Sequence, residues 1–295
     1  MIKVDNAILM AAGASSRMVP LSYECPKALL NVRGEILIER QIRQLQERGI
    51  KEIVVVLGYQ KEKFYYLKEK YGVILLENNA YKERNNHSTL YVARNYLKNS
   101  YICCVDMYYA QNLFQAEEEH SYYSVQFVQG ETDEWCVDSN EQNLINNVTV
   151  GGHDAWVMIG HAFFSEQFSK ILVPYLEKAY HNPEDANTYW EDIYIQHMDE
   201  MDLYVKRYEN GLMLEFDSLQ DLRVFDPRYA VHSGSLILKD LSQRLNCIEN
   251  EIIHIKPIKY NAEAIGFSFQ YNGENYHYLY STKELYQKQS SLIAS

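Results

Sequence analysis

The first residues that could do chemistry lie in "ILMAAGASSRMVPLSYECPKALL", residues 8–30. An apolar run leads into Gly13 and three small residues, then Arg17, and Lys27 follows a proline ten residues later. Backbone N–H groups in such a loop are little shielded and attract phosphate oxygens. Arginine adds a forked contact and lysine a compact charge. The pattern favours a loop that binds phosphates, although an ordinary strand and turn with surface charges would carry the same residue types.

Composition limits what surrounds this loop. The chain has 295 residues, 47% of them hydrophobic and 23% charged, and a formal net charge of −12. These values favour a folded core and argue against a basic surface for nucleic acid or anionic membranes. Positive charge for a phosphate ligand must therefore be concentrated locally. Five scattered cysteines, the lack of a signal peptide and the lack of a long apolar run predict a cytoplasmic protein without disulfides or membrane insertion.

The elements that position the loop follow an alternating pattern. We predict strands at 7–11, 52–59, 73–78 and 100–109, and helices at 36–49, 61–72 and 88–97. This order predicts a parallel sheet with helices on both faces. Ligands bind such sheets at the carboxyl ends of the strands, where the glycine loop and Asp106 would both lie.

The second half is organised differently. Short strands between 120 and 165 are expected to extend the sheet, followed by a helix at 165–182, in which Pro174 predicts a kink or break. Further patterns predict a helix at 188–201, strands at 202–209 and 212–216, and a helix at 217–225. They are followed by a predicted helix at 235–246 and a predicted hairpin that turns at Asn272-Gly273. We predict a catalytic domain over 1–228 and a small appendage over 229–295.

Several motifs together resemble a known family. The segment "LMAAGASSRMVPLSYECPKALLNVRG" is similar to the signature of nucleotidyltransferases that make sugar nucleotides. In order along residues 1–226, "YKERNNHSTLYVA", "NSYICCVDMYY", "DEWCV", "YWEDI" and "EFDSLQDLR" resemble bacterial CTP:phosphocholine cytidylyltransferases. The resemblance implies an α/β, Rossmann-like nucleotidyltransferase fold with a mixed, mostly parallel central sheet. It also implies magnesium-dependent transfer of CMP from CTP to phosphocholine, which gives CDP-choline and pyrophosphate.

The resemblance also assigns nucleotide and metal residues. It implies catalytic roles for Arg17 and Lys27, and Mg²⁺ on Asp106 and Asp217, which suits an ion that takes few protein carboxylates besides phosphates and water. Nucleotide-binding positions would be Ala11, Ala12, Gly13, Ala14, Ser15, Asn86, Ser88 and Asp106. The alternatives are a turn residue at Asp106 and helix capping by Asp217, Asn86 or Ser88.

The acceptor site is predicted from aromatic residues. A trimethylammonium group has no hydrogen-bond donor, so aromatic faces and nearby carboxylates recognise it best. The residues that the resemblance places there are Tyr108, Glu134, Trp135, Tyr189 and Trp190. The alternative for each tryptophan is packing in the core.

Other functions stay open from the sequence. An enzyme of this fold could act on a sugar phosphate or another phosphorylated alcohol such as phosphoethanolamine, and a catalytically inactive protein could sense CTP or choline compounds. Residues 249–281 weakly resemble the first hairpins of choline kinase-like phosphotransferases. The expected glycine-rich turn is absent from that stretch, so we expect no kinase activity; packing, a homodimer contact or an unrelated appendage are the alternatives.

Overall fold

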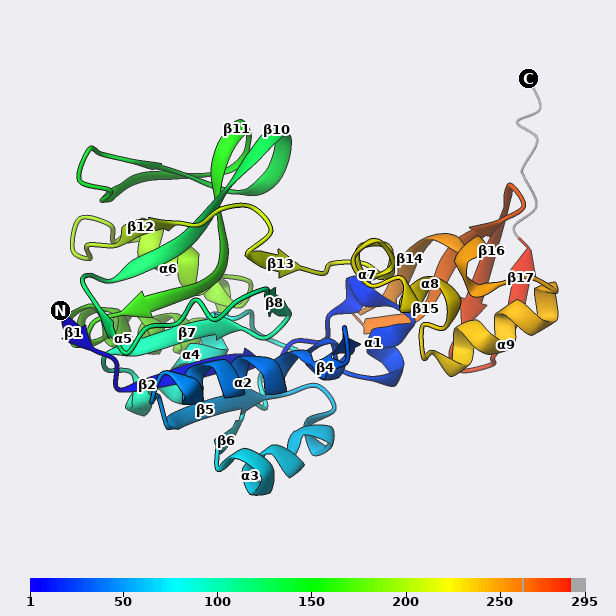
Figure 1. Cartoon of the computed structure of the whole chain (residues 1–295), viewed down its shortest axis with the longest axis horizontal. Helices are drawn as coiled ribbons and strands as arrows, with labels where there is room; N and C mark the ends of the chain where they lie inside the picture. Colours follow the sequence, from blue (N-terminus) through cyan, green and yellow to red (C-terminus); the bar gives the residue numbers. More distant parts are fainter. Residues whose placement is uncertain (262, 288–295) are drawn as a thin grey trace. The chain divides into compact units, whose positions relative to one another are not determined.

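The computed structural model describes residues 1–261 and 263–287. Packing divides the chain into two compact units: unit 1 comprises Met1–Gly13 and Ile36–Glu215, and unit 2 comprises Ala14–Glu35 and Phe216–Ser295 (Figure 1). This division differs from the boundary near residue 228 that the sequence predicts, because the loop at 14–35 and residues 216–228 pack with the C-terminal segment. The two units are described separately.

Unit 1 is built on a seven-stranded sheet of order β12-β10-β11-β7-β2-β5-β6. Strand β2 runs parallel to β5 on one side and to β7 on the other, while β11 is antiparallel to β7. A central strand that is covered on both faces buries every side chain, and Ala7, Ile8 and Leu9 are indeed fully buried. The predicted mixed, mostly parallel sheet is confirmed. Its strands are β2 (Asn6–Ala11), β5 (Glu52–Leu57), β6 (Ile74–Glu77), β7 (Ser100–Cys104), β10 (Tyr122–Ser139), β11 (Ile145–Phe164) and β12 (Tyr204–Arg207).

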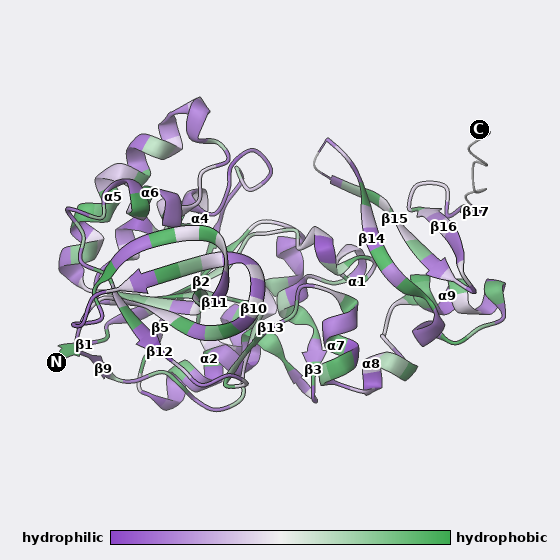
Figure 2. Cartoon of the chain, turned by 90° about the horizontal axis from the view of Figure 1, so that it is seen from above, coloured by the Kyte–Doolittle hydropathy of each residue, from purple (hydrophilic) through white to green (hydrophobic). Residues whose placement is uncertain are grey.

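Helices cover both faces of this sheet. Figures 1 and 2 show α2 on one face and α4, α5 and α6 on the other. In α2, Ile38, Ile42 and Leu45 are buried at the helical spacing expected from the sequence. Figure 2 shows that α5 and α6 carry both hydrophobic and hydrophilic residues, as helices with one covered face do. The helices are α2 (Leu37–Glu47), α3 (Tyr66–Tyr71), α4 (His87–Ala93), α5 (Glu166–His181) and α6 (Trp190–Gln196).

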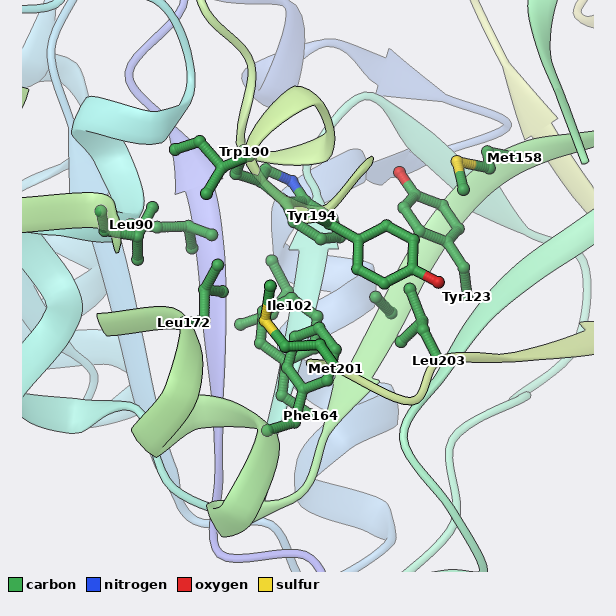
Figure 3. Close-up of a cluster of buried hydrophobic side chains, with 14 of the residues drawn as sticks. Leu90, Ile102, Tyr123, Met158, Phe164, Leu172, Trp190, Tyr194, Met201 and Leu203 are labelled. Carbon is green, nitrogen blue, oxygen red and sulfur yellow. The ribbon is translucent and has the colours of Figure 1, made fainter. Parts of the chain in front are cut away.

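The core of unit 1 lies between the sheet and α4, α5 and α6 (Figure 3). Trp190 is 1% exposed and stacks on Tyr123 with ring centroids 5.6 Å apart. Of the kink or break expected at Pro174, the break is wrong, since α5 continues through the proline, while the kink stays a prediction. Phe168 on one side of the proline and Leu176 on the other are both buried, and burial of each such side chain contributes about 1.5–3 kcal/mol.

The short strands expected between 120 and 165 are in fact two long ones. Strands β10 and β11 pair antiparallel over most of their length, with several register shifts. These irregularities interrupt the alternation of side chains, so the sequence pattern divides each strand into pieces. Unit 1 also contains the pair β8 (Met107–Tyr109) and β13 (Met213–Glu215), and the pair β1 (Ile2–Lys3) and β9 (Glu117–Glu118).

Unit 2 joins the N-terminal loop to the C-terminal segment. Tyr23 stacks on Tyr280 at 3.7 Å, and the Glu24 carboxylate accepts a hydrogen bond from the Leu236 N–H at 2.8 Å. The predicted turn at Asn272-Gly273 is confirmed, with φ of +50° and +79°.

The predicted hairpin of unit 2 proves to be part of a four-stranded antiparallel sheet. The strands are β14 (Ile253–Tyr260), β15 (Glu263–Tyr271), β16 (Glu274–Leu279) and β17 (Leu285–Gln287), and a short pair, β3 (Asn31–Val32) and β4 (Glu35–Ile36), lies in the N-terminal loop. The helices are η1 (Ser16–Met18), α1 (Leu21–Glu24), η2 (Lys27–Leu29), α7 (Leu219–Phe225), α8 (Arg228–Val231), α9 (Leu236–Leu245) and η6 (Glu249–Glu251). Across the described ranges, no helix has the length and apolar character needed to cross a membrane.

Candidate active site

A pocket of about 210 Å³ opens in unit 1 at the carboxyl ends of β2 and β7. It brings together four of the predicted nucleotide residues, which come from three separate parts of the sequence. We call it the loop pocket, and its lining residues are Met10, Ala12, Gly13, Asn78, Tyr81, Arg84, Asn85, Asn86, Thr89, Cys104, Val105 and Asp106. This is the sheet edge at which a parallel α/β fold is expected to bind a ligand.

Two glycines make room for the loop pocket. A Cβ on Gly13 would meet no atom within 4 Å, so the loop backbone there is open to a ligand. A Cβ on Gly58 would lie 2.6 Å from the Ala12 carbonyl oxygen and 2.8 Å from Cγ of Tyr81. The end of β5 can therefore approach the loop only with glycine at position 58, and the Tyr59 N–H donates to that same Ala12 oxygen at 3.0 Å.

Asn86 and Ser88 have different environments. Asn86 precedes α4, but its side chain makes no capping hydrogen bond. Its amide accepts from the Trp190 N–H at 2.8 Å and donates to Glu191 at 3.0 Å, which ties the loop pocket to the start of α6. Ser88 is fully buried, donates to the Asn85 carbonyl and accepts from Asn78. Asn86 lines the loop pocket, whereas Ser88 supports its wall from behind.

Sequence reasoning placed residues 85–89 in the region that reads the base but missed Arg84 and Tyr81, which also line the loop pocket. Arg84 is anchored by the carbonyls of Ala179 and Asn182, at 3.3 and 3.1 Å, so a permanent positive charge is held at the pocket wall. The signal was present in "YKERNN", where the arginine directly precedes the asparagine pair. Such a charge can pair with a phosphate oxygen or donate to a base edge.

Acidic side chains gather on the same sheet edge. Asp106 lies in the turn between β7 and β8, and Glu215 on β13 pairs with Met107 in register. Burial raises the pKa of the Cys104 thiol well above its usual value, and the negative charges of Asp106 and Glu215 raise it further. Burial also raises the pKa of Glu191 to about 7, although Asn86 hydrogen bonds to it. A cation, whether a metal ion or an ammonium group, is the ligand that such an environment attracts.

The predicted acceptor residues fall into two groups. Trp135 and Tyr189 form an edge-to-face pair with centroids 6.0 Å apart, and Tyr189 is 42% exposed. Glu134 is exposed beside Trp135 in the chain. Trp190 is buried in the core, where packing accounts for it, and the buried Tyr108 ring carries the Arg40 guanidinium 4.6 Å above its face. Trp135 and Tyr189 are therefore the pair that a cationic ligand could reach.

In unit 2, Arg17, Lys27 and Asp217 are brought together. The Asp217 carboxylate lies 2.9 Å from the Arg17 guanidinium and 3.5 Å from the Lys27 ammonium. Lys27 is 5% exposed. The alternative that Asp217 caps a helix is wrong, because Ser218 caps α7 and its hydroxyl accepts from the Asp221 N–H at 3.3 Å. The Asp217 carboxylate instead serves as a partner for cations.

The remaining predicted loop residues follow β2 along the chain. Ala11 is the last residue of β2 and belongs to unit 1, while Ala14 and Ser15 begin unit 2. Ser15 has φ of +49°, a left-handed conformation that turns the chain into η1 and towards Arg17. The loop therefore leaves the sheet through small residues and enters the segment that carries both cations.

Candidate metal ligands are sparse in the part of the chain that the structure describes. Within residues 1–261 and 263–287 there is no group of three or more His, Cys, Asp and Glu side chains that could hold a metal. Magnesium needs no such group, because it binds through one or two carboxylates together with phosphates and water. Asp106 in unit 1 and Asp217 in unit 2 each carry one carboxylate of this kind.

Comparisons with known proteins identify the family of this chain. Residues 7–132 match the model of the MobA-like NTP transferase domain. The chain is 35% identical over 218 residues to the choline-phosphate cytidylyltransferase of Streptococcus pneumoniae. The aligned residues cover 74% of this chain and 95% of that protein. The chain belongs to the bacterial CTP:phosphocholine cytidylyltransferase family. As a member of this family it is a nucleotidyltransferase.

The solved structure of the Streptococcus pneumoniae CTP:phosphocholine cytidylyltransferase matches with a TM-score of 0.73, over 77% of this chain and 99% of that one, at 35% identity. The 2-aminoethylphosphonate cytidylyltransferase of Lancefieldella rimae is 36% identical over 228 residues, 76% of this chain and 93% of that protein. Membership of the cytidylyltransferase family therefore leaves the acceptor to be argued from the site.

Proposed function

We propose that this protein transfers CMP from CTP to phosphocholine, giving CDP-choline and pyrophosphate. The observation that carries the proposal is the loop pocket, in which the glycine loop, Asn86 and Asp106 meet at one edge of the sheet. The extent of the match to the Streptococcus pneumoniae enzyme supports it. CTP is a cytoplasmic metabolite, so we propose that the protein acts in the cytoplasm.

The proposal gives the nucleotide two sets of partners. Asn86, Thr89 and Arg84 would bind the nucleoside end in the loop pocket, and their amide, hydroxyl and guanidinium groups suit a cytosine edge and ribose. The backbone from Ala11 to Ser15 would cradle the phosphates, with Arg17 on the β- and γ-phosphates and Lys27 on the α-phosphate and the incoming phosphate.

In the reaction, a phosphate oxygen of phosphocholine attacks the α-phosphorus of CTP, and the bond to the β-phosphate oxygen breaks as pyrophosphate leaves. The nucleophile is already anionic, so no general base is required. Catalysis then rests on positioning and on neutralisation of charge by Arg17 and Lys27.

Asp106 and Asp217 are the carboxylates that we propose for Mg²⁺. When bound, the ion would neutralise triphosphate charge and help to orient the phosphates. In the structure Asp217 is bonded to Arg17 and Lys27, so binding of the nucleotide would transfer these two cations from the aspartate to phosphate oxygens. Asp217 keeps both cations in place until the phosphates arrive.

For the acceptor, the Trp135–Tyr189 pair favours a methylated ammonium, because such a group binds aromatic faces and cannot donate hydrogen bonds. A primary ammonium would instead need carboxylate acceptors. Glu191 and Glu215, whose charges both act on Tyr123, could supply such acceptors. Because the Lancefieldella rimae relative is a 2-aminoethylphosphonate cytidylyltransferase, 2-aminoethylphosphonate is the second candidate acceptor.

We expect pyrophosphate release to be fastest with CTP and phosphocholine when CTP, UTP and ATP are each combined with phosphocholine, phosphoethanolamine, 2-aminoethylphosphonate and glucose 1-phosphate. Addition of EDTA should abolish the signal. A higher kcat/KM for 2-aminoethylphosphonate would establish the second candidate. Preference for glucose 1-phosphate, or CTP binding without release for every acceptor, would contradict the proposal.

Gly58→Ala is expected to weaken CTP binding at least ten-fold and to lower the melting temperature. The new methyl group would collide with the Ala12 carbonyl and the Tyr81 ring, both of which line the loop pocket. Overpacking of this kind destabilises by about 1–3 kcal/mol. Calorimetric titration with CTP and thermal unfolding measure the two effects.

Gly13→Ala is the matched control, because its methyl group meets no protein atom. It should weaken CTP binding while it leaves the melting temperature unchanged. If Gly58→Ala bound CTP as tightly as the wild type, the loop pocket would not be the nucleotide site.

A further inference from the structure

Unit 2 contains a cavity of about 430 Å³ that the proposed reaction does not use. Its walls come from η1, from α7 and from the first residues of β14. We call it the Arg223 cavity, and its lining residues are Arg17, Val19, Ser218, Leu219, Gln220, Arg223, Ile253, His254 and Ile255. Of these, Arg17 also belongs to the proposed catalytic machinery.

Arg223 is a buried cation whose hydrogen bonds do not cancel its charge. The side chain is 6% exposed, and its two terminal nitrogens donate to the Ile252 carbonyl at 2.9 Å and the Glu249 carbonyl at 2.6 Å. Its Nε atom is buried and has no hydrogen-bond partner. Carbonyl oxygens carry no net charge, so the guanidinium remains positive within the protein, where an unpaired charge is unfavourable.

The acid that acts on Arg223, Glu249, does so through space and without a hydrogen bond from its carboxylate. The Glu249 carboxylate raises the pKa of Arg223, which burial lowers more strongly. That carboxylate is itself bonded to the N–H and hydroxyl of Ser233, with the N–H contact at 2.9 Å. The positive charge of Arg223 is therefore only partly neutralised by the protein, and an anion in the adjoining cavity would neutralise the rest.

The other polar walls suit the same ligand. Arg17 is 70% exposed and bonds to Asp217 through one of its nitrogens. Gln220 and His254 are exposed at the cavity and add an amide and an imidazole. His254 has φ of +50° at a register shift in β14, a backbone state that few non-glycine residues adopt. Among the described residues that line the cavity, none is acidic.

We propose that the Arg223 cavity binds a pyrophosphate group, and that its occupation competes through Arg17 with the triphosphate of the substrate. The second half of this statement rests on the proposed function, since it requires Arg17 to hold the triphosphate. A bound anion would draw Arg17 away from Asp217 and from the nucleotide, and the cavity would then act as an inhibitory site. The group could come from pyrophosphate that the reaction releases or from a nucleoside diphosphate in solution.

Binding of inorganic pyrophosphate to the full chain in EDTA tests the site without catalysis. We expect calorimetry to show saturable binding to the wild type, weakened at least ten-fold in Gln220→Glu. That substitution keeps the shape of the side chain and places one negative charge in the cavity. It also lies in the first turn of α7, where a carboxylate is tolerated, so the fold should be kept. Gln243→Glu, the same change at an exposed position of α9, should bind pyrophosphate like the wild type.

Inhibition assays then separate the source and the coupling. Under turnover conditions, pyrophosphate and CDP are added in separate series, and the apparent KM for CTP is measured in each. The compound that occupies the cavity should raise this KM less in Gln220→Glu than in the wild type. Equal pyrophosphate affinity of the wild type and Gln220→Glu would overturn the proposal. If the protein bound pyrophosphate in EDTA but showed no transferase activity, the proposed anion site would be supported and the proposed function would be rejected.

Discussion

Replacement of Lys27 by alanine is expected to lower kcat for CDP-choline formation by about 10²–10³-fold, the usual effect of removing one preorganised electrostatic contact. The Lys27 side chain is only 5% exposed, and its ammonium group lies 3.5 Å from the Asp217 carboxylate. A charge in so dry a position acts strongly on a nearby phosphate, because little water screens it.

The fold should survive this change. Asp217 keeps its contact of 2.9 Å with Arg17, so the mutation does not leave the carboxylate without a cation. The measurement is steady-state pyrophosphate release, with circular dichroism and thermal unfolding to verify the fold. Lys239→Ala is the matched control, since Lys239 is exposed on α9, and it should retain full activity. A folded Lys27→Ala protein with nearly normal kcat would remove Lys27 from the catalytic group.

Asp106→Asn is expected to lower kcat/KM by about 10²-fold or more and to raise the magnesium concentration needed for half-maximal rate. The substitution keeps the size and shape of the side chain but replaces one carboxylate oxygen with a donor and removes the negative charge that a hard cation requires. Asp106 lines the loop pocket beside the glycine loop, so its loss should affect the nucleotide complex and leave stability little changed.

Activity measured across a magnesium titration separates a metal ligand from a residue that only shapes the pocket. A metal ligand shifts the magnesium dependence, whereas a shaping residue lowers the rate at every magnesium concentration. Asp199→Asn, an exposed carboxylate elsewhere in unit 1, should behave as the wild type. An unchanged magnesium requirement in Asp106→Asn would mean that Asp106 does not bind the ion.

Local signals in the sequence account for much of the architecture. The apolar runs predicted as strands became β2, β5 and β6, and the apolar spacing of residues 38, 42 and 45 became the buried side of α2. These features depend on neighbours within a few positions, because strand and helix periodicity are local properties. The same holds for the turn at Asn272-Gly273, whose positive φ values only a few residue types adopt readily.

Contacts between distant segments decided the rest. Trp135 and Trp190 occur in equally suggestive motifs, yet one forms an accessible pair with Tyr189 and the other fills the core against Tyr123. Likewise, Asp217 and Ser218 are both capping residues by type, and only the folded chain assigns the cap to Ser218 and the cations to Asp217.

The sequence by itself determined the order of strands and helices in the first part of the chain, the loop of small residues after β2 and the residues from which we propose that a nucleotide site is built. The tertiary structure alone decided which of those side chains are exposed, which carboxylate holds which cation, and that Arg223 is buried beside a cavity. The physical reason is that burial and charge pairing depend on segments as far apart as Lys27 and Asp217, whose approach no local pattern encodes.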